Sequence, residues 1–102
     1  MMSILHTDGS GESDVPTEQL LALYDELQHA DREHGEVSVT NDDNGWAISA
    51  HRDGRVVLVH LVTFEAFHMI PVTRGEVLNL WQSLIGGDIA GLQRLPWRAG
   101  YT

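Results

Sequence analysis

Residues 46–62 read WAISAHRDGRVVLVHLV, and this stretch decides the fold that the sequence predicts. Side chains 46–51 alternate between two faces, residues 55–62 return as a second strand, and Asp53-Gly54 lies between them. That pair is a strong signal for a two-residue hairpin loop, because a type I′ turn needs positive φ at both central positions. One face of the hairpin, which we expect to be buried, then carries Trp46, Ile48, Ala50, Val57, Val59 and Leu61.

Two further strands are expected beside this hairpin. Residues 36–40 alternate with valine on one face, and the polar segment 41–45 that follows has the composition of a turn. Residues 68–72 are expected to form a fourth strand, which Pro71 ends because proline cannot donate to a strand ladder. The four segments together predict an antiparallel meander.

Residues 17–34 are expected to form an amphipathic helix before the sheet. Thr17 is suited to accept a backbone N–H at its start, and Gly35 is suited to the left-handed residue that ends it. The apolar stripe of this helix, at three- and four-residue spacing, consists of Leu20, Leu23, Tyr24, Leu27 and Ala30.

A second helix is expected after the sheet. Thr73 and Glu76 form a capping box, in which each side chain satisfies a backbone N–H group of the first turn. Gly86-Gly87 ends the helix, and Asp88 is placed to cap one further turn. The apolar stripe of this helix consists of Val77, Leu80, Trp81 and Leu84.

These elements predict an α+β fold. An N-terminal helix, a four-stranded antiparallel meander sheet and a C-terminal helix follow in order, with both helices covering one sheet face. Residues 1–14 are polar and contain glycine, so we expect a flexible N-terminal arm there. Residues 15–102 are expected to form a single domain, since one hydrophobic core suffices at this size.

The formal net charge of −9 limits the classes of partner. Nucleic acids and anionic membranes both require cationic surface, so neither is expected to bind. Residues 1–36 carry nine acidic side chains against a single arginine, so the negative charge belongs to the expected N-terminal arm and first helix. That helix face is either a solvated surface or a docking surface for another, basic protein. The docking residues would be Asp25, Glu26, Asp31 and Glu33.

The sequence favours the cytoplasm as the compartment. The chain has no cysteine, which fits a reducing environment. Its N-terminus has no basic region followed by an apolar stretch, so no signal peptide is expected. No apolar run approaches the roughly 20 residues that a membrane helix needs.

The six histidines contain no motif with metal-ligand spacing. His60 and His68 become diagonal neighbours in one strand register, so they are the weak candidates for a metal or small-ligand site. Ser49 lies within a strand, without the glycine turn that exposes a catalytic serine. We therefore expect no enzyme activity, no resident metal and no cofactor.

Trp97 follows Pro96 and has arginines on both sides. Tryptophan and arginine are enriched in binding hot spots, so Trp97 and Arg98 are candidates for contact with a partner. The alternative is that Trp97 folds back onto the edge of the core or stacks under Arg98.

Much of the chain resembles the Imm1 type of bacterial immunity protein, a group of small proteins that neutralise a co-produced toxin. The similarity covers about residues 36–98 and is a pattern of hydrophobic spacing. It includes GWAI at 45–48, DGRVVL at 53–58, IPV at 70–72, the apolar stripe of the second helix and the closing Pro96-Trp97. The resemblance implies stoichiometric binding of a toxin without a cofactor, and no catalytic residue carries over.

Three functional hypotheses follow from the sequence. The leading one is a non-catalytic, acidic protein-binding module, an immunity-type inhibitor of a basic toxin such as a nuclease. The second is a structural or regulatory domain that forms a homodimer through an exposed sheet edge. The third is a metal or small-ligand binder that uses His60 and His68.

Overall fold

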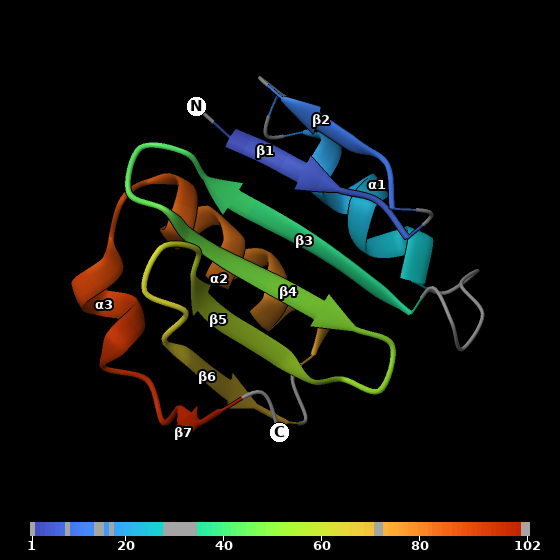
Figure 1. The fold of residues 1–102 in the computed structure, drawn as a ribbon. Helices are drawn as coiled ribbons and strands as arrows, with labels where there is room; N and C mark the ends of the chain where they lie inside the picture. Colours follow the sequence, from blue (N-terminus) through green and yellow to red (C-terminus); the bar gives the residue numbers. More distant parts are fainter. Residues whose placement is uncertain are drawn as a thin grey trace.

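The hairpin around Asp53-Gly54 lies in the middle of an antiparallel sheet in the computed structural model (Figure 1). The structure describes residues 2–7, 9–13, 16, 18–27, 35–70 and 73–100. Within these residues the sheet has seven strands in the order β2-β1-β3-β4-β5-β6-β7. The strands are β1 (Met2–Leu5), β2 (Gly11–Ser13), β3 (Glu36–Asn41), β4 (Trp46–His51), β5 (Val56–His60), β6 (Ala66–Met69) and β7 (Arg98–Ala99).

The predicted architecture of a four-stranded meander between two helices is therefore wrong. Residues 1–14, predicted to be a flexible arm, contain β1 and β2, and β7 lies in the tail of the chain. β1 pairs with β3 along its whole length, and this pairing buries the side chains of Met2 and Ile4 in the core. A strand of four residues is too short to show a clear period, so its polar, glycine-containing surroundings concealed it.

The register between β4 and β5 also differs from the prediction, by one residue. His51 N donates to Arg55 O at 2.8 Å and Gly54 N donates to His51 O at 3.0 Å, so the loop has three residues. The positive φ in this loop belongs to Gly54, at 90°, as in a type I turn followed by one left-handed residue. Ile48 consequently pairs with Leu58. Because one residue of slip inverts a strand, β5 contributes Val56 and Leu58 to the core in place of the predicted Val57, Val59 and Leu61.

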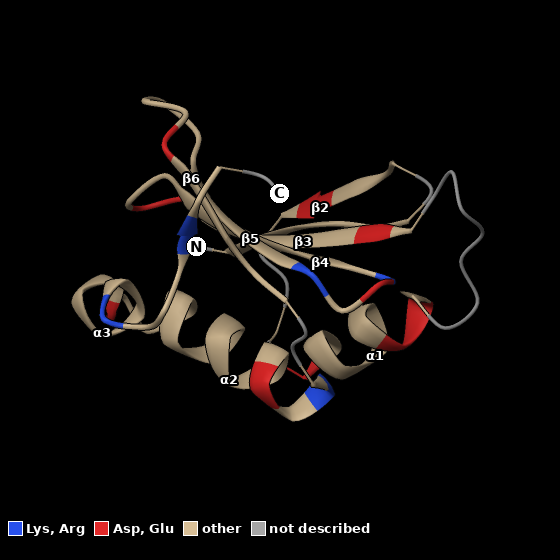
Figure 2. Ribbon diagram, turned by 90° about the horizontal axis from the view of Figure 1, so that it is seen from below, with Lys and Arg blue, Asp and Glu red and all other residues tan. Residues whose placement is uncertain are grey.

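Three helices within the described residues cover one face of the sheet (Figure 2). They are α1 (Gln19–Glu26), α2 (Arg74–Ile85) and α3 (Ile89–Gln93). α1 ends at its C-cap Leu27, and it buries Leu20 and Leu23. The predicted cap Thr17 and the predicted continuation over 28–34 lie outside the described residues. None of the helices in the described part is long and apolar enough to cross a membrane.

α2 begins at the predicted cap residue Thr73, although the Glu76 carboxylate accepts from the Thr73 hydroxyl and not from the predicted backbone N–H. The Thr73 hydroxyl accepts from Glu76 N at 3.3 Å and lies 2.9 Å from the Glu76 carboxylate, to which it donates. The predicted cap of α3 is confirmed as well, since Asp88 Oδ1 accepts from Gly91 N at 3.1 Å. The predicted apolar stripe of α2 is buried, with Val77, Leu80, Trp81 and Leu84 in the core.

Two buried polar contacts link α2 to the sheet. The indole N–H of Trp81 donates to Ile48 O at 3.0 Å, and Trp81 is fully buried. The Asn41 amide nitrogen at the end of β3 donates to Leu84 O at 2.9 Å. Because an unpaired polar group in the core is destabilising, these contacts select one position of the helix on the sheet.

Candidate functional site

Two loops meet at one end of the sheet (Figure 1). The β3–β4 loop (residues 42–45) and the β5–β6 loop (residues 61–65) are joined by a hydrogen bond in which Leu61 N donates to Gly45 O at 2.9 Å. We call residues 42–45 and 61–65 the loop end. The antiparallel path of β3 to β6 places both loops on the same side of the molecule, so their side chains form one surface.

The loop end exposes large apolar side chains. Leu61 is 49% exposed, Val62 76% and Phe64 73%. The other exposed large hydrophobic side chains of the described residues are scattered over separate elements, namely Leu5, Leu21, Ile70 and Leu95. Single exposed apolar residues are ordinary, whereas a cluster of them on one loop indicates an interaction surface.

The backbone of the β5–β6 loop has a defined and strained conformation. Phe64 has a φ of 61°, the one positive φ of a non-glycine residue within the described chain. Phe64 N donates to His60 O at 2.8 Å, and His60 N donates to Glu65 O at 2.9 Å. A left-handed conformation costs an aromatic residue about 1–2 kcal/mol, so these hydrogen bonds have to hold it in place. Strain of this kind is concentrated at functional positions.

The side chain of His60 holds this loop through hydrogen bonds to its backbone. Its Nδ1 accepts from Val62 N at 3.2 Å and from Thr63 N at 3.3 Å. Because both partners are donors, Nδ1 is unprotonated and Nε2 carries the proton of the neutral ring. The ring packs edge-on against Trp46, with centroids 4.9 Å apart. Gly45 has a φ of 76°, which favours glycine, and a Cβ at this position would touch the same ring at 3.4 Å.

Acidic side chains occur in both loops of the loop end. Asp42, Asp43 and Glu65 are exposed, and residues 41–45 and 61–65 contain no lysine or arginine. The Ser3 hydroxyl of β1 donates to Asp42 Oδ2 at 2.8 Å, which places this carboxylate beside the first strand. Figure 2 shows acidic residues in the loops at this end of the sheet. An apolar centre with a charged rim is the usual composition of a protein–protein contact.

The acidic residues predicted for docking on the first helix have other contacts. Asp25 accepts from Arg74 Nη2 at 3.2 Å and so links α1 to α2. Glu26 accepts from His6 Nδ1 at 2.6 Å. Asp31 and Glu33 lie outside the described residues. The docking role of this helix stays a prediction, and it competes with intramolecular contacts at the two residues that are described.

Trp97 packs against the core from the end of the sheet. It is half-buried, and its indole N–H donates to Leu92 O at 2.7 Å. Arg98 is exposed in β7, where it pairs with His68 of β6. The geometry supports the alternative in which Trp97 closes the core edge, while contact of Arg98 with a partner stays a prediction.

His60 and His68 lie on opposite faces of the sheet. His60 pairs with Trp46 on the helix-covered face, whereas His68 pairs with Val57 on the other. His68 is buried and donates from Nδ1 to Gly100 O at 3.0 Å. The two rings therefore do not converge, and no group of three or more potential metal ligands occurs in the described part of the chain.

A groove of about 320 Å³ lies on the sheet face away from the helices, with side chains of β3, β4 and β5 around it. Arg55 Nη2 donates to His51 Nδ1 at 3.2 Å, so His51 Nε2 carries the proton and donates to Ser49 Oγ at 3.2 Å. In this tautomer His51 cannot take a proton from Ser49. Burial lowers the pKa of His51, while the charge of Glu36 opposes that change. The three side chains thus form a chain of hydrogen bonds on this face of the sheet.

The loop end thus stands out within the described surface because it exposes apolar side chains, holds a strained backbone through hydrogen bonds and carries carboxylates in both loops. A sequence signal for it existed in the run Leu61-Val62-Thr63-Phe64, which is unusually apolar for a turn but was obscured because its first half continues an apolar strand. Comparisons of this chain with protein-family models, with curated proteins and with solved structures found no match.

Proposed function

We propose that this protein is a non-catalytic protein-binding module that docks through its loop end onto an apolar site of a basic partner. The observation that carries the proposal is Phe64, which is 73% exposed and strained at a φ of 61°. An exposed aromatic side chain gains from being buried, and a strained backbone at that position is retained where it serves a contact.

The energetics favour a small number of anchoring side chains. Burial of Val62 and Phe64 by a partner would contribute about 1.5–3 kcal/mol each. The hydrogen bonds that His60 Nδ1 accepts from the loop backbone order the loop before binding, which lowers the entropy that association has to overcome. A preformed apolar anchor is thus the feature that gives this module its affinity.

Charge determines the class of partner in this proposal. The net charge of −9 and the carboxylates of Asp42, Asp43 and Glu65 favour a protein with cationic residues around its apolar site. Nucleic acids and anionic membranes are disfavoured for the same electrostatic reason. Association should be fast at low salt and should slow as salt is added.

The resemblance to Imm1 immunity proteins supplies a specific version of the proposal. In that version the partner is a co-produced basic toxin, such as a nuclease, which is bound stoichiometrically in the cytoplasm and without a cofactor. A homodimer through a sheet edge has less support, because the described edge strands β2 and β7 have only three and two residues. Short edge strands offer few free backbone groups for pairing.

The test removes the apolar anchor while preserving the loop. Val62→Ser with Phe64→Asn achieves this, because asparagine tolerates the left-handed conformation. Leu21→Ser with Leu95→Ser is the matched control, since both residues are exposed hydrophobics that do not belong to the loop end. The first partner to test is the product of the adjacent gene, followed by proteins retained from the organism's lysate.

A true partner is expected to form a stoichiometric complex with the wild type and the control, measured by calorimetry on purified proteins. Its Kd should rise at least tenfold for the Val62→Ser/Phe64→Asn variant, since two apolar anchors are lost. A partner that binds this variant as tightly as the wild type would overturn the assignment of the loop end. Turnover of a substrate by the purified protein would overturn the non-catalytic reading.

A further inference from the structure

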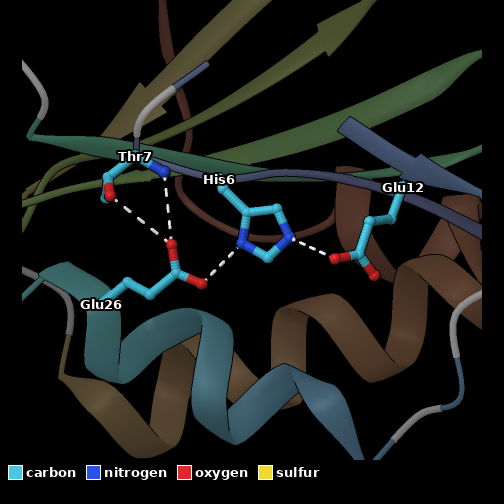
Figure 3. A network of polar contacts seen from close by, with 4 residues as sticks. All are labelled: His6, Thr7, Glu12 and Glu26. Carbon is cyan, nitrogen blue, oxygen red and sulfur yellow. Dashed lines mark hydrogen bonds and ion pairs between the residues drawn. The ribbon is translucent and has the colours of Figure 1, made fainter. Parts of the chain in front are cut away.

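His6 lies between two carboxylates (Figure 3), beyond the end of β1 that is remote from the loop end. Its Nδ1 is 2.6 Å from Glu26 Oε2, and its Nε2 is 3.0 Å from Glu12 Oε1. The side chain of His6 is 20% exposed, so its contact with Glu26 is partly shielded from water, whereas the contact with Glu12 is exposed. The same Glu26 carboxylate accepts from Thr7 N at 3.4 Å and from the Thr7 hydroxyl at 3.5 Å.

The geometry of the His6 ring specifies its protonation state. Ionised carboxylates only accept hydrogen bonds, and a neutral imidazole has one N–H and one lone pair. A neutral ring could satisfy either Glu12 or Glu26 and would turn its lone pair toward the other. Both contacts are favourable only when the ring is the doubly protonated imidazolium.

These contacts connect three elements of the fold. His6 follows β1, Glu12 belongs to β2, and Glu26 is the last residue of α1. β1 pairs with β3 and buries two side chains in the core, whereas β2 is exposed along its length. The imidazolium therefore ties the β1–β2 hairpin to the helix beneath it.

We propose that His6 is a proton-operated latch, which when protonated holds the β1–β2 hairpin on α1 and when neutral lets the hairpin open locally. Opening is confined to this hairpin, because the strands from β3 to β6 keep their own pairing and their own cover of helices. Exposure of the β3 edge, Glu36–Asn41, is the structural consequence.

The direction of the pH dependence follows from the charges around the ring. The hydrogen bond to Glu26 raises the pKa of His6 above its ordinary value of 6.5, burial opposes this, and the Glu12 contact adds to it. Within the described residues these two carboxylates are the charges that act on the ring, while the neighbouring Asp25 is paired with Arg74 of α2. Because the pKa of His6 is raised in the folded protein, His6 stabilises the closed hairpin fully below pH 6.5. This stabilisation is lost as the pH rises through the folded pKa.

Amide hydrogen exchange on the intact protein between about pH 6 and pH 9 tests the latch, with an NMR titration of the His6 ring alongside. The measured rates are first corrected for intrinsic exchange. The opening constant of β1 and β2 amides should then rise about tenfold for each pH unit between the pKa of His6 in the open state and its pKa in the folded state. Amides of β4 and β5 in the same spectra are the internal control and should show no such rise.

His6→Gln should leave β1–β2 exchange independent of pH over this range, since an amide does not titrate there. Glu12→Gln keeps the histidine and removes one carboxylate, so the response should shrink and the His6 pKa should fall. A wild-type hairpin whose corrected protection does not change with pH would overturn the proposal. An unaltered pH response in His6→Gln would do the same.

Discussion

Removal of the His60 ring is expected to disorder the β5–β6 loop and weaken binding while leaving the sheet folded. His60→Leu deletes the acceptor that binds Val62 N and Thr63 N at 3.2 and 3.3 Å. Both bonds are long and lie at an exposed loop, where water can replace the acceptor, so their loss costs about 0.5 kcal/mol each at the low end of the usual range. Loss of the edge-on contact with Trp46 adds about 0.5–1 kcal/mol.

The expected sum is a decrease of about 1.5–2 kcal/mol in the free energy of unfolding, measured by urea denaturation. Amides 62–64 should lose their protection from exchange, whereas amides of β4 should change only in line with global stability. His60→Asn is the matched variant, because the asparagine Oδ1 takes a position close to that of histidine Nδ1 and restores an acceptor.

Two results would refute this reasoning. One is a His60→Leu protein whose loop amides stay as protected as in the wild type, which would show that the ring does not organise the loop. The other is equal loss of loop protection in His60→Asn and His60→Leu, which would show that the acceptor is unimportant and that ring packing alone matters.

Three further perturbations test the fold and its pH dependence. Gly54→Ala forces a side chain onto a φ of 90° and should lower the free energy of unfolding by about 1–2 kcal/mol, measured by urea denaturation. The control is Gly75→Ala in α2, where a new Cβ meets nothing within 4 Å, and it should raise the free energy of unfolding by up to about 1 kcal/mol. Trp81→Phe removes the donor to Ile48 O and should destabilise by about 2–3 kcal/mol; a loss below about 0.5 kcal/mol would contradict the role of that bond. Burial lowers the pKa of His51 in the folded protein, so its contribution to stability is intact above pH 6.5 and declines as the pH falls through the folded pKa. Free energies of unfolding measured at pH 5, 6 and 7 should show this decline, and His51→Gln should reduce it.

Most helical features of this chain are legible in its sequence. The Thr73–Glu76 cap, the buried stripe of α2 and the Asp88 cap are local, because each depends on residues three or four positions apart. The turn at Gly54 is local too, but its length is not. Asp53-Gly54 fits a two-residue loop as well as a three-residue one, and the choice inverts every side chain of the following strand.

The candidate site was less accessible to sequence reasoning than the fold. The predicted register puts Val59 and Leu61 on the buried face and therefore His60 on the opposite one, whereas the structure pairs His60 with Trp46 on the helix-covered face, where it supports the β5–β6 loop. The acidity of the first helix was visible, but its carboxylates at Asp25 and Glu26 have partners from distant segments. Positive φ at Phe64 has no sequence signature, since aromatic residues rarely adopt it.

The amino-acid sequence by itself determines that this chain is acidic, that α2 and α3 begin at their caps, and that strands flank Gly54. Tertiary structure alone decides that Met2–Leu5 joins the sheet, which β5 side chains are buried, and that Leu61, Val62 and Phe64 gather at one exposed end. The physical reason is the distance along the sequence between the residues that interact. Caps and turns depend on neighbours along the chain, whereas strand register and surface clusters depend on pairing between segments that are distant in sequence.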